Sequence, residues 1–231
     1  QSLNGTWKFH WAPNPDERPA DFFTPGYDAS AWDDLAVPSS WNIAGIQKDG
    51  TQKYGTPIYV NQPVIFQHRV AVGDWKGGVM RTPPTHWTTY NHRNEVGSYL
   101  RTFEVPASWD GREVFITFDG VDSFFYLWIN GQYVGFSKNS RNAAEFNITQ
   151  YLQEGENTLA VEVYRSSDAS FLEAQDMFRL PGIFRTVAIQ SRPSVRVRDL
   201  VVKPDLDENY QNGVLNISAD LLNTSKKNIK N

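Results

Sequence analysis

The pair Asn130-Gly131 is the sequence feature that most constrains the fold, because it predicts a β-hairpin from Ser123 to Ser137. Both residues tolerate the positive φ angles of a type I′ turn, the preferred two-residue connection between antiparallel strands. The strand before the turn carries apolar side chains on both faces: Phe124, Tyr126 and Trp128 on one, and Phe125, Leu127 and Ile129 on the other. We therefore expect this strand to be central in its sheet and buried on both sides.

Apolar residues alternate with polar ones in several other segments, at 7–11, 99–105, 114–118 and 159–163. A period of two residues places one face of a strand on a core and the other in water. Helical periodicity is weak, and only 146–153 is expected to form one or two helical turns. Many short strands separated by Gly, Pro and Asn turns predict an all-β fold, either a sandwich or a jelly roll.

Two regions depart from this regular pattern. The segment 12–96 is rich in Pro, Gly, Asp and Asn, and it is expected to be a long loop region with a functional or docking role. A boundary near Pro193 divides the chain into a domain of residues 1–192 and a shorter domain of residues 193–231. In the second, 195–197, 200–202 and 214–222 are expected to be strands. Two or three strands cannot close a sandwich, so this domain is expected to be truncated.

The composition excludes several classes of function. The hydrophobic fraction of 40% suits a globular core, and the absence of cysteine excludes disulfides and thiolate sites. A net charge of -4 gives no reason to expect nucleic acid or membrane partners, and no apolar stretch is long enough to cross a bilayer. The first residues lack the features of a signal peptide, which leaves a cytoplasmic or a periplasmic location open.

The acidic residues Glu173 and Asp176 are the best candidates for chemistry, because both lie among apolar residues. A buried acid needs a partner or a metal. The alternative is a structural ion pair with Arg179 or Arg185, and spacing alone favours that alternative. His68, His86 and His92 match no common zinc pattern, so they are expected to be solvated or interface residues.

Six segments, in order along the chain, carry a resemblance to a known family. They are Ser2–Phe9, Val37–Asn42, Pro57–Asn61, Phe118–Gly131, Ser140–Phe146 and Asp168–Phe184. Together they resemble the amino-terminal part of glycoside hydrolase family 2, and the third and sixth resemble its β-galactosidase branch most closely. The resemblance implies a sugar-binding jelly-roll β-sandwich, similar to galactose-binding domains, followed by the first strands of an immunoglobulin-like β-sandwich.

The same resemblance implies that a TIM barrel beyond this chain carries both catalytic glutamates, so no catalytic residue is expected here. It implies that Asn61 and Asp176 bind the galactosyl group, and that Asp176 binds sodium once the barrel is present. The family's magnesium ligands align with Lys138 and Asp168, but a protonated lysine cannot ligate a cation. A magnesium site is therefore doubtful, and no cofactor is expected in residues 1–231 alone.

The resemblance therefore implies a retaining β-galactosidase that hydrolyses terminal β-D-galactosyl residues, with this chain as a non-catalytic, inactive part. Its expected partners are a galactoside substrate, its own catalytic barrel and further copies of itself in a homo-oligomer. Two alternatives stay open: a stand-alone carbohydrate-binding module, and the same domain of a β-glucuronidase or β-mannosidase.

Overall fold

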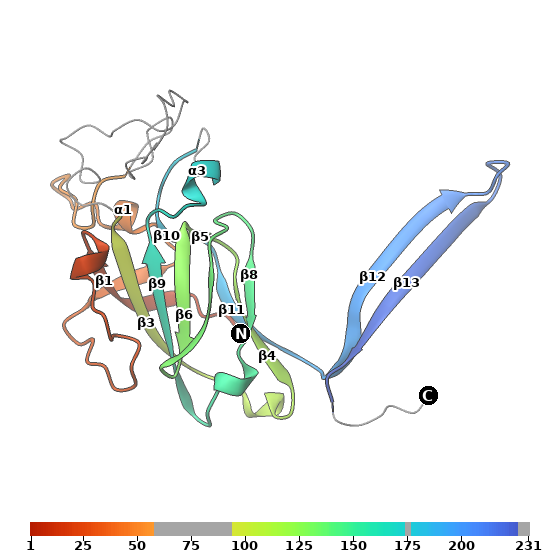
Figure 1. Cartoon of the computed structure of the whole chain (residues 1–231), viewed down its shortest axis with the longest axis horizontal. Coiled ribbons are helices and arrows are strands. Elements are labelled where there is room, and N and C mark those ends of the chain that lie inside the picture. Colours follow the sequence, from red (N-terminus) through yellow and green to blue (C-terminus); the bar gives the residue numbers. More distant parts are fainter. Residues whose placement is uncertain (58–93, 174–176, 226–231) are drawn as a thin grey trace, which may run out of the picture. The chain divides into compact units, whose positions relative to one another are not determined.

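The computed structural model describes residues 1–57, 94–173 and 177–225. It divides into two compact units, one of Gln1–Val105 with Phe115–Gln190 and the other of Pro106–Val114 with Ser191–Asn231. The first unit is a β-sandwich, shown in Figure 1. The fold is all-β, as the alternating pattern predicts.

The larger layer of the sandwich is an antiparallel sheet with strand order β2-β1-β3-β9-β6-β7. Its strands are β1 (Gly5–Ala12), β2 (Asp33–Val37), β3 (Val96–Glu104), β6 (Phe124–Ile129), β7 (Gln132–Ser137) and β9 (Glu156–Tyr164). The segment 12–96, expected to be a long loop, therefore contributes a strand, because β2 pairs with β1.

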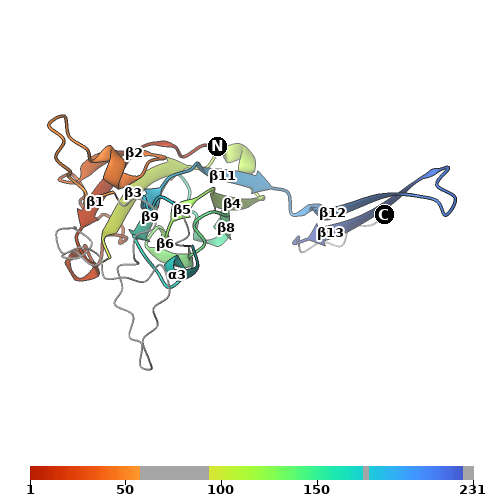
Figure 2. The same ribbon diagram turned by 90° about the horizontal axis from the view of Figure 1, so that it is seen from above.

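The smaller layer contains a three-stranded sheet of order β11-β4-β8 and a two-stranded sheet of β10 and β5. Its strands are β4 (Glu113–Phe118), β5 (Val121–Asp122), β8 (Ala144–Asn147), β10 (Gly182–Ile183) and β11 (Val187–Arg192). Figure 2 shows the two layers from above, with β1, β3, β9 and β6 in one and β11, β4 and β8 in the other.

Aromatic side chains fill the space between the layers. The ring of Phe125 on β6 lies 4.8 Å from that of Phe118 on β4 and 6.0 Å from that of Phe146 on β8. At the other end of the core, Phe9 on β1 packs 4.8 Å from Tyr99 on β3. Trp7 is also fully buried. The alternating residues of β1 thus form the core face that their period predicts.

The predicted hairpin is present, with φ of 51° at Asn130 and 78° at Gly131. Strand β6 is internal, between β9 and β7. Its expected burial on both faces holds for one face only. Phe125, Leu127 and Ile129 are buried, whereas Phe124, Tyr126 and Trp128 are partly exposed. The outer face is covered by other aromatic rings rather than by a second layer, as where Phe23 stacks on Trp128 at 4.8 Å.

Helices are short, as the weak helical periodicity predicts. The described residues form α1 (Trp41–Ala44), α3 (Ser170–Glu173), η1 (Pro15–Glu17), η2 (Ala107–Trp109) and η3 (Thr149–Tyr151). The helical turns expected over 146–153 reduce to the single turn η3, because Phe146 belongs to β8 and pairs with Ile116 of β4. Within the described residues, no helix has the length and apolar character required to cross a bilayer.

The second unit contains a long antiparallel pair, β12 (Val195–Leu206) and β13 (Gly213–Asn223). The two strands expected at 195–197 and 200–202 are one strand, interrupted only by a register shift between Val197 and Asp199. Apolar side chains of both strands are exposed, including Leu215 at 60% and Leu221 at 74%. This pair of strands therefore has uncovered apolar surface.

Candidate functional site

Both predicted substrate-binding residues, Asn61 and Asp176, lie outside the described residues. So do His68, His86 and His92. The structure does describe the residues that flank the two predicted substrate ligands. Those before and after the segment 58–93 meet at one end of the large sheet, where β3 begins and β9 ends, and the site is built from there.

A buried ion pair between Glu95 and Arg165 lies at this end of the sheet. The Arg165 Nη1 atom is 2.6 Å from Oε1 of Glu95, and the side chains are 2% and 0% exposed. Oε2 of Glu95 accepts weaker hydrogen bonds of 3.4 to 3.5 Å from the indoles of Trp11 and Trp41 and from the amide of Asn42. A charge is buried at acceptable cost only when an opposite charge and hydrogen bonds compensate for its desolvation, so the side chains of this cluster keep a fixed arrangement.

The ion pair and the residue that follows Arg165 hold both ends of the segment that contains Asn61. Arg165 Nη2 donates to the carbonyl of Thr56 at 2.7 Å, and the Asn94 side chain accepts from the Ser166 amide at 2.8 Å. Gly55 has a φ of 70°, and a Cβ there would lie 2.5 Å from the Glu95 carboxylate. Only glycine fits this close approach, so Gly55 packs directly on the Glu95 carboxylate.

The helix α3 holds the residue that precedes the segment 174–176. Glu173 accepts hydrogen bonds from the backbone amide of Ser140 at 2.9 Å and from its hydroxyl at 2.5 Å. Within the described residues, Glu173 forms no ion pair with Arg179 or Arg185. That alternative is therefore wrong for Glu173. Arg185 instead donates to the carbonyls of Asp119 and Arg141.

A second buried carboxylate, Asp122 of β5, lies beside Glu173. Burial is the main cause that raises its pKa to about 6, and the nearby Glu173 raises it further, whereas Arg141 opposes the shift. The Arg141 Nη2 atom lies 3.3 Å from Oδ2 of Asp122. Nε and Nη2 of Arg179 are buried and meet no hydrogen-bond acceptor in the described part of the chain.

These side chains line one small cavity of about 30 Å³, to which Arg165 and Met177 also contribute. Arg165 therefore connects the residues that flank Asn61 with those that flank Asp176. Each carboxylate that lines this cavity already accepts from an arginine or a serine, whereas Nε and Nη2 of Arg179 meet no acceptor among the described residues. The arrangement suits rigid positioning of the residues that flank 58–93 and 174–176 rather than acid–base chemistry.

The residues aligned with the expected magnesium ligands form an ion pair. Nζ of Lys138 lies 2.8 Å from Oδ2 of Asp168, and this hydrogen bond lowers the pKa of Asp168. The ammonium group already neutralises the Asp168 carboxylate, and a protonated lysine cannot ligate a cation, so these residues do not fit a magnesium ion. In the described segments, no group of three or more acidic, histidine or cysteine side chains could hold a metal.

Sequence reasoning missed Glu95, Arg165 and Asp122 as members of the site. Each is an isolated charge in the sequence, next to or within a short apolar strand. A charged residue directly at the end of an apolar strand, such as Arg165 after β9, is the signal that could have indicated burial with a partner.

Comparison with known proteins adds a family. Residues 1–193 match the family described as "Glycosyl hydrolases family 2, sugar binding domain". A protein named beta-galactosidase from Priestia megaterium is 47% identical over 96% of this chain, and one from Halalkalibacterium halodurans is 40% identical over 99%. The chain spans 20% of the length of each of these relatives.

A solved structure of Bacteroides uniformis beta-glucuronidase 2 superposes with a TM-score of 0.66. It is 20% identical, and the match covers 97% of this chain and 22% of that one. Likeness at this identity shows a common fold alone.

Proposed function

Because this chain belongs to glycoside hydrolase family 2, through a sugar-binding domain that occupies residues 1–193, we propose that it is the non-catalytic part of a retaining β-galactosidase. The observation that carries the proposal is the 47% identity, over nearly the whole chain, to a relative named beta-galactosidase. The proposed reaction of the whole protein is hydrolysis of terminal β-D-galactosyl residues.

The proposed role of this chain is to supply part of the galactosyl subsite. Asn61 and Asp176 are the proposed ligands, and Asp176 is proposed to bind sodium together with the barrel. The support from the described residues is indirect. Arg165 binds the Thr56 carbonyl, and it lines a cavity together with Glu173 and Met177. One arginine therefore lies next to residues that flank 58–93 and to residues that flank 174–176. Retaining glycosidases use two carboxylates about 5–5.5 Å apart, and these are proposed to lie in the barrel.

The proposed partners are a galactoside, the chain's own catalytic barrel and further copies of the protein. Magnesium is not proposed as a cofactor, because Lys138 already neutralises Asp168. Titration of the protein with magnesium chloride should leave its melting temperature unchanged, apart from the ionic-strength effect that calcium or sodium chloride also produces. A specific rise with magnesium would contradict this part of the proposal.

The decisive experiment compares substrates on the longest protein that this reading frame encodes. Hydrolysis of nitrophenyl β-galactoside should exceed that of the β-glucuronide and the β-mannoside by at least tenfold. Purified residues 1–231 should hydrolyse none of them, because positioning groups give little acceleration without an acid and a nucleophile. A preference for the glucuronide, or a reading frame that encodes no barrel, would support one of the alternatives instead.

A further inference from the structure

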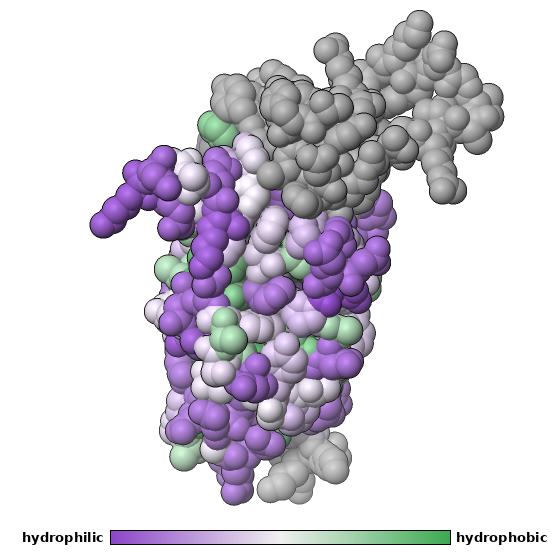
Figure 3. All heavy atoms as spheres, turned by 90° about the vertical axis from the view of Figure 1, so that its left-hand side faces the viewer, coloured by the Kyte–Doolittle hydropathy of each residue, from purple (hydrophilic) through white to green (hydrophobic). Residues whose placement is uncertain are grey.

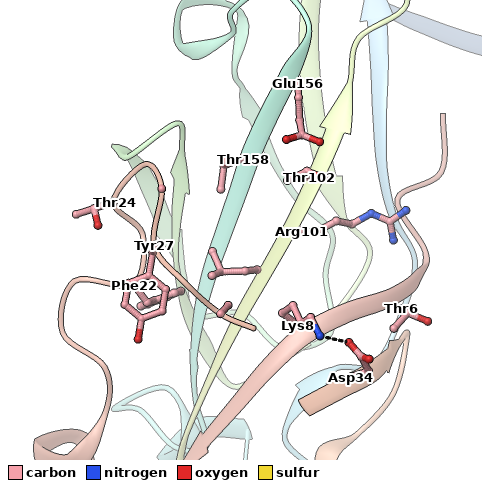
Figure 4. Close-up of a pocket in the computed structure, with 13 residues that line it drawn as sticks. Thr6, Lys8, Phe22, Thr24, Tyr27, Asp34, Arg101, Thr102, Glu156 and Thr158 are labelled. Carbon is pink, nitrogen blue, oxygen red and sulfur yellow. Dashed lines mark ion pairs between the residues drawn. The ribbon is translucent and has the colours of Figure 1, made fainter. Parts of the chain in front are cut away.

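A separate hollow of about 560 Å³ opens on the outer face of the large sheet. It lies between that face and the loop that follows β1, as Figure 4 shows. Its volume is within the range of small-molecule sites. The residues that line it include Lys8, Phe22, Tyr27, Asp34, Thr102 and Thr158.

The floor of the hollow follows from strand register. Thr102 of β3 pairs directly with Thr158 of β9, so their side chains lie next to each other on one face. Lys8 of β1 pairs with Asp34 of β2, and Nζ of Lys8 lies 2.9 Å from Oδ1 of Asp34. The floor thus offers two neighbouring hydroxyls and an ion pair, held on four strands that are rigid by pairing.

Aromatic side chains form the wall of the hollow, and further apolar side chains pack behind them. Phe22 is fully buried against Leu100, and Tyr27 packs edge-on against Trp32 with ring centroids 5.5 Å apart. Figure 4 shows Phe22, Thr24 and Tyr27 together on the loop side, opposite Thr102 and Thr158 on the strands. A ligand between them would meet an aromatic surface on one side and hydroxyls on the other.

The charged groups that face the hollow do not favour an anion. Lys8 and Asp34 form an ion pair, and Glu156 adds a second carboxylate. The Arg101 side chain points away from the loop side of the hollow in Figure 4, and its Nη1 atom donates to the carbonyl of Asn4. A neutral ligand with many hydroxyls can both donate to the carboxylates and accept from the Lys8 ammonium.

The hollow is distinct from the cavity that Glu173 and Arg165 line. The Thr102–Thr158 pair is six residues along the ladder from the Val96–Tyr164 pair, which is next to Arg165. At about 3.3 Å per residue, this corresponds to about 20 Å. No residue that lines the hollow also lines that cavity.

We propose that this hollow binds a neutral saccharide, with the ring's C–H face on Tyr27 and its hydroxyls on Thr102, Thr158 and the Lys8–Asp34 pair. Saccharides combine an apolar face with a dense set of hydroxyl donors and acceptors, and that combination matches this lining. Figure 3 shows a mostly hydrophilic face in its coloured residues, with small scattered apolar areas. The proposal rests on the hollow and is independent of the proposed enzyme activity.

The test is a titration of residues 1–231 with lactose and with cellobiose, in which binding is detected from backbone amide shifts in NMR spectra. We expect saturable shifts at Thr102, Thr158 and their neighbours with at least one of the two sugars. The double variant Thr102→Val, Thr158→Val keeps the size and strand preference of both residues, and it should weaken binding at least tenfold. The control Thr51→Val removes an exposed hydroxyl outside the hollow and should leave the affinity unchanged.

Three results would overturn the proposal. One is the absence of saturable shifts at the hollow with either sugar, in a spectrum whose dispersion shows that the chain is folded. Another is unchanged affinity in the double valine variant. The third is stronger binding of glucuronate, titrated in the same way, than of the neutral sugars, because the two carboxylates in the lining predict the opposite. Failure of the galactosidase proposal would show instead in substrate hydrolysis, which this titration does not measure.

Discussion

Arg165 reaches Glu95 across the β9–β3 pair and, with the other end of its guanidinium, binds the carbonyl of Thr56. One arginine therefore joins the ends of two strands to the start of the segment that carries Asn61. Both charged side chains are almost completely buried, so water cannot solvate the remaining charge when one partner is removed.

Replacing Glu95 by Gln should leave the Arg165 charge buried and unpaired, at a cost of about 3–5 kcal/mol in unfolding free energy. Denaturant unfolding monitored by tryptophan fluorescence measures this loss. The control Lys53→Met breaks the half-exposed Lys53–Asp33 pair and should cost at most about 1 kcal/mol. Adding Arg165→Met to Glu95→Gln should restore part of the loss. Equal losses of unfolding free energy in Glu95→Gln and Lys53→Met would contradict the stabilising role of the buried pair.

Asp122 should make the stability depend on pH. Its folded pKa of about 6 exceeds the ordinary value of 3.8, so the native state binds more protons than the unfolded state between these values. The unfolding free energy contributed by Asp122 therefore falls as the pH rises from about 4 to 6. At about 1.4 kcal/mol per pKa unit, the loss approaches 3 kcal/mol. Asp122→Asn should remove this loss, so the variant should gain stability relative to wild type as the pH rises. A constant difference from pH 4 to 7 would refute the assignment.

The turn of the β6–β7 hairpin should depend on Gly131 for two reasons. Its φ is 78°, and a Cβ there would lie 2.7 Å from Cδ of Pro25. Gly155 has the same φ, but a Cβ there would have no heavy atom within 4 Å. Gly155→Ala should therefore cost about 1 kcal/mol from backbone strain, and Gly131→Ala about 2–3 kcal/mol. Equal melting temperatures of the two variants would show that Pro25 adds nothing.

The strands β12 and β13 should exchange their amide protons faster than the internal strands β6 and β9. Their side chains are almost all exposed, so few buried contacts oppose local opening. Native-state hydrogen exchange on residues 1–231 measures this difference. Protection in β12 equal to that in β6 would mean that the second unit has a core of its own.

In the proposed full-length β-galactosidase, Asp176→Ala should lower kcat/KM for a β-galactoside, which corresponds to a loss of about 2–5 kcal/mol in transition-state stabilisation. The proposed reason is a contact with the sugar 6-hydroxyl through sodium. An α-L-arabinoside lacks that hydroxymethyl group, so the same mutation should cost much less on it. Equal losses on both substrates would indicate a structural carboxylate.

Local sequence predicted much of the fold because its signals are local. The Asn130-Gly131 turn and the alternation in β1 and β9 depend on neighbouring residues alone, and the structure confirms them. The second face of β6 was predicted incorrectly, since an apolar face can be covered by rings such as Phe23 and Tyr133 instead of a second layer. The assignments of Asn61 and Asp176 stay predictions.

The sequence by itself determined strands with a clear alternating pattern, such as β1 and β9, together with the main hairpin and, through its six motifs, the family. Only the tertiary structure decided which charges meet. The register that pairs Val96 with Tyr164 brings Glu95 beside Arg165, 70 residues later in the chain. The same register aligns Thr102 with Thr158 on the floor of the hollow. Register depends on the whole sheet, because it is fixed by the burial of one complete face of every strand.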